Sequence, residues 1–128
     1  MSIKPIQIAT ARYWSPAIRA SRLVPLGSSV GMPRYLGYEI GGNVGLLAPH
    51  GLRKIEDDAE FDAAYLARLE RFGVKKIADV LTAFARGYDA KGVVLLCFED
   101  ITKDGVSCHR TLFGEWWTAQ TGDRVVEL

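Results

Sequence analysis

The segment from Val93 to Phe98, within "GVVLLCFED", is apolar at every position. A strand with one wet face alternates apolar and polar residues, whereas a strand buried on both faces is continuously apolar. The segment therefore predicts a central strand of a parallel sheet. This constrains the fold strongly, because such a strand needs a covering layer on each side.

Two amphipathic segments upstream predict helices for those layers. Residues 57–73 begin with Asp57 three positions before Glu60, as in a capping box, and end at Gly73. Residues 74–88 repeat the apolar period of a helix. Each segment has one apolar stripe, so each is expected to pack one face on the sheet.

Shorter elements complete the pattern. We expect strands at residues 6–11, near 23–26 and near 123–128, and a helix from Ser107 or Cys108 to Gln120. Pro25 weakens the second strand or places it at a sheet edge, because proline cannot donate to a ladder. Residues 27–53 contain seven glycines and two prolines, which predicts a loop.

These elements predict one α/β domain over residues 1–128. We expect three layers, with a mostly parallel central sheet and helices on both faces. The chain has 128 residues, of which 48% are hydrophobic and 24% charged, as in an ordinary globular protein. A chain of this length can bury a core without disulfide or metal support.

Charge and hydropathy exclude several classes of protein. The net charge is +1, from 16 basic and 15 acidic residues, which argues against a non-specific polyanion binder. No run of about 18 apolar residues predicts a membrane span. The first residues lack the apolar core of a secretory signal. We therefore expect a cytoplasmic protein whose Cys97 and Cys108 are free thiols.

Known motifs for phosphate, nucleophile and metal sites are missing. The chain has neither G-x-x-x-x-G-K-[ST] nor G-x-G-x-x-G. The "GSSVG" stretch has Ser29 at the centre of a G-x-S-x-G pattern, but no helix follows it. A metal site would need to gather His50, Cys97, Cys108 and His109 without any C-x-x-C or H-x-x-x-H pair. We therefore expect neither a metal ion nor a cofactor.

The topology predicts where a ligand would bind. In a parallel α/β sheet, ligands occupy the crevice beyond the carboxyl ends of the strands. The side chains expected at that rim are Arg12, Tyr13, Ser28, Arg34, Glu99, Cys108, His109 and Arg110.

The start of the last helix adds its own chemistry. Unpaired N–H groups there stabilise an anion, which Arg110 with Arg12 or Arg34 would clamp. The same field lowers the pKa of a cysteine in the first turn, so Cys108 is a candidate thiolate. His109 need not be its partner, because adjacent residues of a helix point in different directions. The alternative is that Cys108 packs as a small apolar side chain.

The chain resembles the domain of unknown function 488 family over nearly its whole length. The resemblance lies in "LLCFE", "CHRTLFGEWW", "LLAP", "FDAAYLARLERFG" and "MPRY", of which Cys-His-Arg is the most specific. It implies an α/β domain whose activity is not settled. The site residues that it implies are Cys97, Glu99, Cys108, His109, Arg110, Glu115 and Arg34. The stretch "RYWSPAIRASRL" departs from the family, so the role of Arg12 rests on topology.

Three functions follow from these residues. The first is binding of a small phosphorylated ligand, a nucleotide or a nucleic-acid phosphate, at Arg110. The second is an enzyme acting on a nucleotide-like substrate, with Cys108 or Glu99 as nucleophile or base and His109 and Arg110 assisting. The third is a structural or interaction protein that uses an aromatic patch to bind a partner or a second copy of itself, as in a homodimer. That patch would contain Trp14, Tyr35, Tyr38, Trp116 and Trp117.

Overall fold

The computed structural model describes residues 6–103 and 108–128. Its five strands form one sheet in the order β3-β2-β4-β1-β5. The strands are β1 (Gln7–Arg12), β2 (Val24–Gly27), β3 (Gly42–Asn43), β4 (Gly92–Cys97) and β5 (Val126–Glu127). Every pair of neighbouring strands is parallel. The predicted α/β fold is therefore confirmed.

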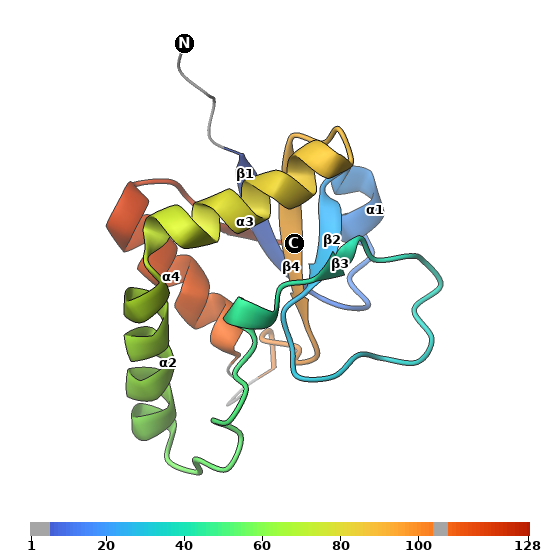
Figure 1. Ribbon diagram of the computed structural model, residues 1–128. Coiled ribbons are helices and arrows are strands. Elements are labelled where there is room, and N and C mark those ends of the chain that lie inside the picture. The colour runs from blue at the N-terminus through green and yellow to red at the C-terminus, as the bar shows by residue number, and fades with distance from the viewer. Residues whose placement is uncertain (1–5, 104–107) are drawn as a thin grey trace.

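Helices cover both faces of the sheet unequally (Figure 1). The helices are α1 (Ala17–Ser21), α2 (Asp58–Phe72), α3 (Val74–Gly87) and α4 (His109–Thr121), with a short 3-10 helix, η1 (Gly45–Leu47). The three long helices share a core with one face, and α1 with residues 36–40 covers the other. Within the described part of the chain, none of the helices has both the length and the apolar character needed to cross a membrane.

Strand β4 is the centre of the molecule. All six of its residues are buried. Val93 and Leu95 pack into the core under the three long helices, whereas Val94 and Leu96 pack towards α1. The continuous apolar run is thus explained by two hydrophobic cores, one on each face of the same strand.

Strand β2 lies inside the sheet, not at its edge as Pro25 led us to consider. It pairs with β4 on one side and with the two-residue strand β3 on the other. The carbonyl of Pro25 accepts a hydrogen bond from the N–H of Gly41 at 2.7 Å. The nitrogen of Pro25 also faces β3. That strand has only two residues, so its hydrogen-bond ladder does not require the N–H that proline lacks.

The helix boundaries follow their local chemistry. The side chain of Asp57 accepts from the N–H of Glu60 at 3.3 Å, so the predicted N-cap is confirmed. Gly73 has φ of 82° after α2, a conformation that favours glycine. Helix α4 begins at His109, with Cys108 as its N-cap. Ser107, the earlier start that we considered, lies outside the described residues.

Both tryptophans of α4 are buried, although the third of the expected functions placed them in an aromatic patch. Trp116 is 7% exposed and Trp117 is 5% exposed. This is achieved because α4 packs on α2 and α3 as well as on the sheet. The indole N–H of Trp116 donates to Glu70 on α2 at 2.7 Å. Neither tryptophan can therefore contribute to a surface aromatic patch.

Candidate functional site

Beyond the carboxyl ends of two neighbouring strands, the chain turns to opposite faces of the sheet. After β1 it passes to α1 on one face, and after β4 it passes to α4 on the other. Strands β1 and β4 are neighbours. Such a divergence opens the crevice in which parallel α/β sheets bind ligands. The candidate site lies beside this crevice.

A cavity of about 490 Å³ occupies this position. Its wall combines the end of β4, the start of α4, residues 29–30 and the segment from Pro49 to Asp62. The volume suits a small-molecule site. The ionisable side chains in the wall are Arg53, Asp58, Asp62, Cys97, Glu99, Cys108, His109 and Glu115.

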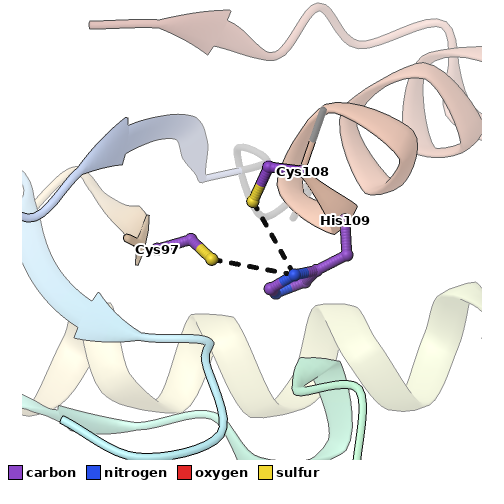
Figure 2. Close-up of side chains that lie close together, drawn as sticks. All are labelled: Cys97, Cys108 and His109. Atoms are coloured by element: carbon purple, nitrogen blue, oxygen red, sulfur yellow. Dashed lines mark hydrogen bonds between the residues drawn. The ribbon is translucent and has the colours of Figure 1, made fainter. Parts of the chain in front are cut away.

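Cys97, Cys108 and His109 meet at the wall of this cavity, and we call them the thiol–imidazole cluster. The Nδ1 atom of His109 lies 3.7 Å from the sulfur of Cys97 and 3.7 Å from the sulfur of Cys108. Figure 2 shows both contacts converging on one ring nitrogen. All three side chains are buried. One imidazole nitrogen therefore faces two thiols.

The other nitrogen of His109 is held by the backbone. Nε2 lies 2.7 Å from the carbonyl oxygen of Ser28, so Nε2 carries the proton and donates it. Ser28 is itself fixed, because its N–H and its hydroxyl each donate to the carbonyl of Leu96 at 2.9 Å. In the neutral ring, Nδ1 is consequently left with a lone pair directed at the thiols.

The approach of Cys108 to its neighbour depends on where α4 begins. Cys108 has extended backbone angles, φ −145° and ψ 146°, and only His109 onward is helical. Adjacent residues inside a helix diverge, but this pair spans the boundary. The sulfur and the imidazole can therefore meet, which the sequence reasoning did not expect.

The cluster separates the acidities of the two cysteines. The hydrogen bond from Cys97 lowers the pKa of Cys108 to about 6, assisted by His109 and the backbone N–H of Arg110 against the effect of burial. The pKa of Cys97 is raised by the same contact with Cys108, by burial and by Glu99. Of the two sulfurs, Cys108 is thus the one that ionises first, whereas Cys97 keeps its proton and donates it to Glu99.

Glu99 lies beside the cluster as a carboxylate. Its Oε2 atom is 2.9 Å from the sulfur of Cys97. Burial acts to raise the pKa of Glu99, but the hydrogen bond from Cys97 helps to bring it below the ordinary value. The carboxylate is therefore ionised at neutral pH and is available to accept a proton.

Arg110 points away from the cavity towards β5. It is 1% exposed, and its Nη2 forms an ion pair with Glu127 at 3.0 Å. Its Nε donates to the same carboxylate at 3.1 Å. Burial alone would lower the pKa of Arg110, but Glu127 and the nearby Cys108 sulfur raise it. Two of its donors are therefore committed within the fold.

The other expected site residues are dispersed. Tyr13 is fully buried and its hydroxyl lies 2.6 Å from the hydroxyl of Ser29. Ser28 is buried and contributes its carbonyl to His109. Arg12 is half-buried, and Arg34 is exposed in the glycine-rich segment. Neither arginine lines the cavity.

Two parts of the site go beyond what the residues alone predicted. Cys97 was implied as a site residue only by the family resemblance, and its buried sulfur contacts both His109 and Glu99. The wall formed by Arg53, Asp58 and Asp62 lies in and after the segment predicted as a loop. The position of Cys97 at the end of a strand was a usable signal, because strand ends form such sites.

Comparison with known proteins adds no family. The chain matches no protein-family model, no curated protein and no solved structure. The resemblance to the domain of unknown function 488 family accordingly stays a prediction from the residues.

Proposed function

We propose that the protein is a cysteine-dependent enzyme that acts on a small molecule in the 490 Å³ cavity, with Cys108 as the nucleophile. The observation that carries the proposal is the contact between the Cys108 sulfur and Nδ1 of His109. A nucleophile beside a base that a third group orients is the general arrangement for covalent catalysis. Here the third group is the carbonyl of Ser28.

The residues supply a balanced first step. Nδ1 of His109 holds the proton that Cys108 has given up, and the Cys108 thiolate attacks an electrophilic carbon of the substrate. The S–C bond forms, the bond from that carbon to its leaving group breaks, and the imidazolium returns the proton to the leaving group. The start of α4 directs its free N–H groups at the negative charge of the sulfur.

Glu99 fits the second step of the same cycle. It lines the cavity as an ionised carboxylate next to the cluster. A carboxylate there takes a proton from water as the water attacks the S-linked intermediate, and the sulfur leaves with the electron pair of the S–C bond. The proposed reaction class is therefore transfer or hydrolysis of an acyl or related electrophilic group.

A reactive ester tests this proposal. The protein, freed of any metal ions, is incubated with 4-nitrophenyl acetate. It is expected to release nitrophenolate in a burst and to carry one acetyl group on Cys108, detected by peptide mass spectrometry. Cys108→Ser should abolish the burst, and His50→Ala, which changes the exposed histidine outside the cluster, should keep it. Equal bursts from wild type and Cys108→Ser would overturn the proposal.

Binding of a phosphorylated ligand is the second candidate function, and one observation supports it. Arg53 lines the cavity and is the one arginine or lysine among its described wall residues. Arg53 would hold the anion in place of Arg110, because Arg110 is paired with Glu127. A nucleoside monophosphate should then raise the melting temperature of the wild type and of Arg34→Ala but not of Arg53→Ala. Equal shifts in all three would remove this candidate.

A further inference from the structure

We propose that Cys97, Cys108 and His109 form a tetrahedral site for a thiophilic divalent cation, Zn²⁺ in particular, whose fourth position faces the cavity. The three ligand atoms lie within 4.8 Å of one another. The inference goes beyond the proposed function, because it requires no nucleophilic reaction at Cys108. Its consequence for catalysis does rest on the proposed function.

The type of ligand selects the metal. Two thiolates and an imidazole are soft to borderline donors, which favour Zn²⁺ over Mg²⁺ or Ca²⁺. Zinc sites with three protein ligands and one open position commonly combine cysteine and histidine in this way. All three residues are buried, so the cation would be shielded from bulk water on the side of the protein.

The spacing already suits zinc. Zn–S bonds of about 2.3 Å and Zn–N bonds of about 2.0 Å at a tetrahedral angle place sulfur and nitrogen about 3.5 Å apart. The two sulfur–nitrogen distances in the cluster are 3.7 Å. The two sulfurs lie within 4.8 Å of each other. A tetrahedral zinc ion places two sulfurs about 3.8 Å apart, so a cation would draw them together by up to about 1 Å.

The orientation of His109 supports the same site. A histidine that binds a metal usually donates its other ring N–H to a carbonyl or carboxylate, which fixes the ligating nitrogen. Nε2 of His109 donates to the carbonyl of Ser28 at 2.7 Å. Nδ1 is thus the ligating atom, and it is the atom that faces both sulfurs.

Charge and protons balance around the proposed cation. Coordination requires both cysteines as thiolates, so the thiol protons leave to the solvent. The hydrogen bond from Cys97 to Glu99 is lost, and the carboxylate can then face the fourth position, either as a ligand or as the acceptor for bound water. The two thiolates neutralise the divalent cation, whereas Arg110 stays paired with Glu127.

Metal binding and thiol reactivity exclude each other at this site. A coordinated Cys108 sulfur and a coordinated Nδ1 cannot act as nucleophile and base at the same time. The metal-bound protein is accordingly expected to be protected from acetylation and alkylation at Cys108. This would make zinc an inhibitor of the reaction proposed above.

Cobalt titration tests the site directly. The reduced, metal-free protein is titrated with Co²⁺ without oxygen, and Zn²⁺ is then added. We expect thiolate-to-cobalt charge transfer and the strong visible bands of tetrahedral cobalt, saturating at one ion per chain and lost on adding one equivalent of Zn²⁺. Wild type lacking these bands would overturn the inference, and this measurement needs no variant to fold.

Variants assign the ligands. Cys97→Ser, Cys108→Ser and His109→Ala should each weaken Co²⁺ binding by more than about 100-fold, since even outer partners of a metal site contribute roughly 10–100-fold. The control His50→Ala should bind like wild type. Unchanged affinity in folded variants of the cluster, checked by circular dichroism, would also overturn the site.

The two proposals fail separately. Cobalt bands without acetylation of the metal-free Cys108 would remove the proposed enzyme and keep the metal site. Acetylation of Cys108 without cobalt bands would do the reverse. Both results together, with Zn²⁺ suppressing acetylation, are what we expect.

Discussion

At the scale of single residues, the function depends on how the protons of two thiols and one imidazole are shared. His109 is fixed by the carbonyl of Ser28, and the thiol of Cys97 donates to Glu99. Cys108 alone at the surface would resemble a free cysteine. Its acidity comes from Cys97 at the end of β4, from the adjacent His109 and from the backbone N–H of Arg110 at the start of α4.

The pH dependence of alkylation should report this environment. In metal-free protein, the rate of iodoacetamide addition to Cys108 is expected to rise with an inflection near pH 6, because its pKa is lowered to about 6. The thiolate is thus present above that pH and is lost below it. His109→Ala should move the inflection upwards, since His109 helps to lower the pKa.

The alkylation rates of native Cys108 and of the same thiol in urea are best compared in mild acid. A thiolate of low pKa is a weaker nucleophile, which removes most of its advantage at pH 7. At about pH 5.5 the native Cys108 should still react roughly 10-fold faster than the same thiol in urea. An inflection near 8.5, the ordinary cysteine range, would contradict the prediction.

At the scale of elements, the site depends on how closely β1 and β4 approach. A Cβ atom on Gly92 would lie 1.9 Å from the carbonyl oxygen of Gln7, the residue paired with it across the ladder. That oxygen belongs to the backbone and cannot rotate away. The contact joins the first residues of the two strands, and the residues that follow in both strands contribute to the two hydrophobic cores.

Gly92→Ala is therefore expected to destabilise the fold. We predict a loss of about 1–3 kcal/mol in the free energy of unfolding, measured by urea titration, since the backbone must shift to admit the methyl group. Gly87→Ala is the control, because its Cβ would meet nothing within 4 Å and it ends α3. Equal stability of the two variants would contradict this account.

At the scale of the whole molecule, the end of the chain is tied to the sheet by a buried charge. Strand β5 pairs with β1 over only two residues, both exposed. Glu127 adds to this short pairing, because its carboxylate accepts hydrogen bonds from Arg110 on α4 and from the hydroxyl of Thr10 on β1. One carboxylate thus connects three elements that meet behind the candidate site.

Glu127→Ala should consequently destabilise the protein. Removing the carboxylate leaves the guanidinium of Arg110 buried without its partner. We expect a loss of about 1–3 kcal/mol by urea titration, below the value for a fully buried pair because the Glu127 side chain is 32% exposed. Lys75→Ala, which breaks the exposed pair with Asp79, should leave the urea midpoint unchanged. A similar effect of both variants would contradict the role of Glu127.

Local patterns in the sequence determined the architecture. The apolar run of β4, the capping box of α2 and the amphipathic period of α3 each depend on residues within a few positions of one another. Burial and hydrogen bonding of such segments are largely decided by those neighbours. The parallel α/β fold and the edge of the sheet that holds the candidate site followed from them.

Only the tertiary structure decided which side chains meet there. Cys97 and His109 are 12 positions apart, His109 and Ser28 are 81 apart, and Arg110 turns instead to Glu127. These contacts depend on where α4 begins and on which strands are neighbours, and no sequence period encodes either. The sequence therefore located the site, whereas the packing of β2, β4 and α4 determined its chemistry.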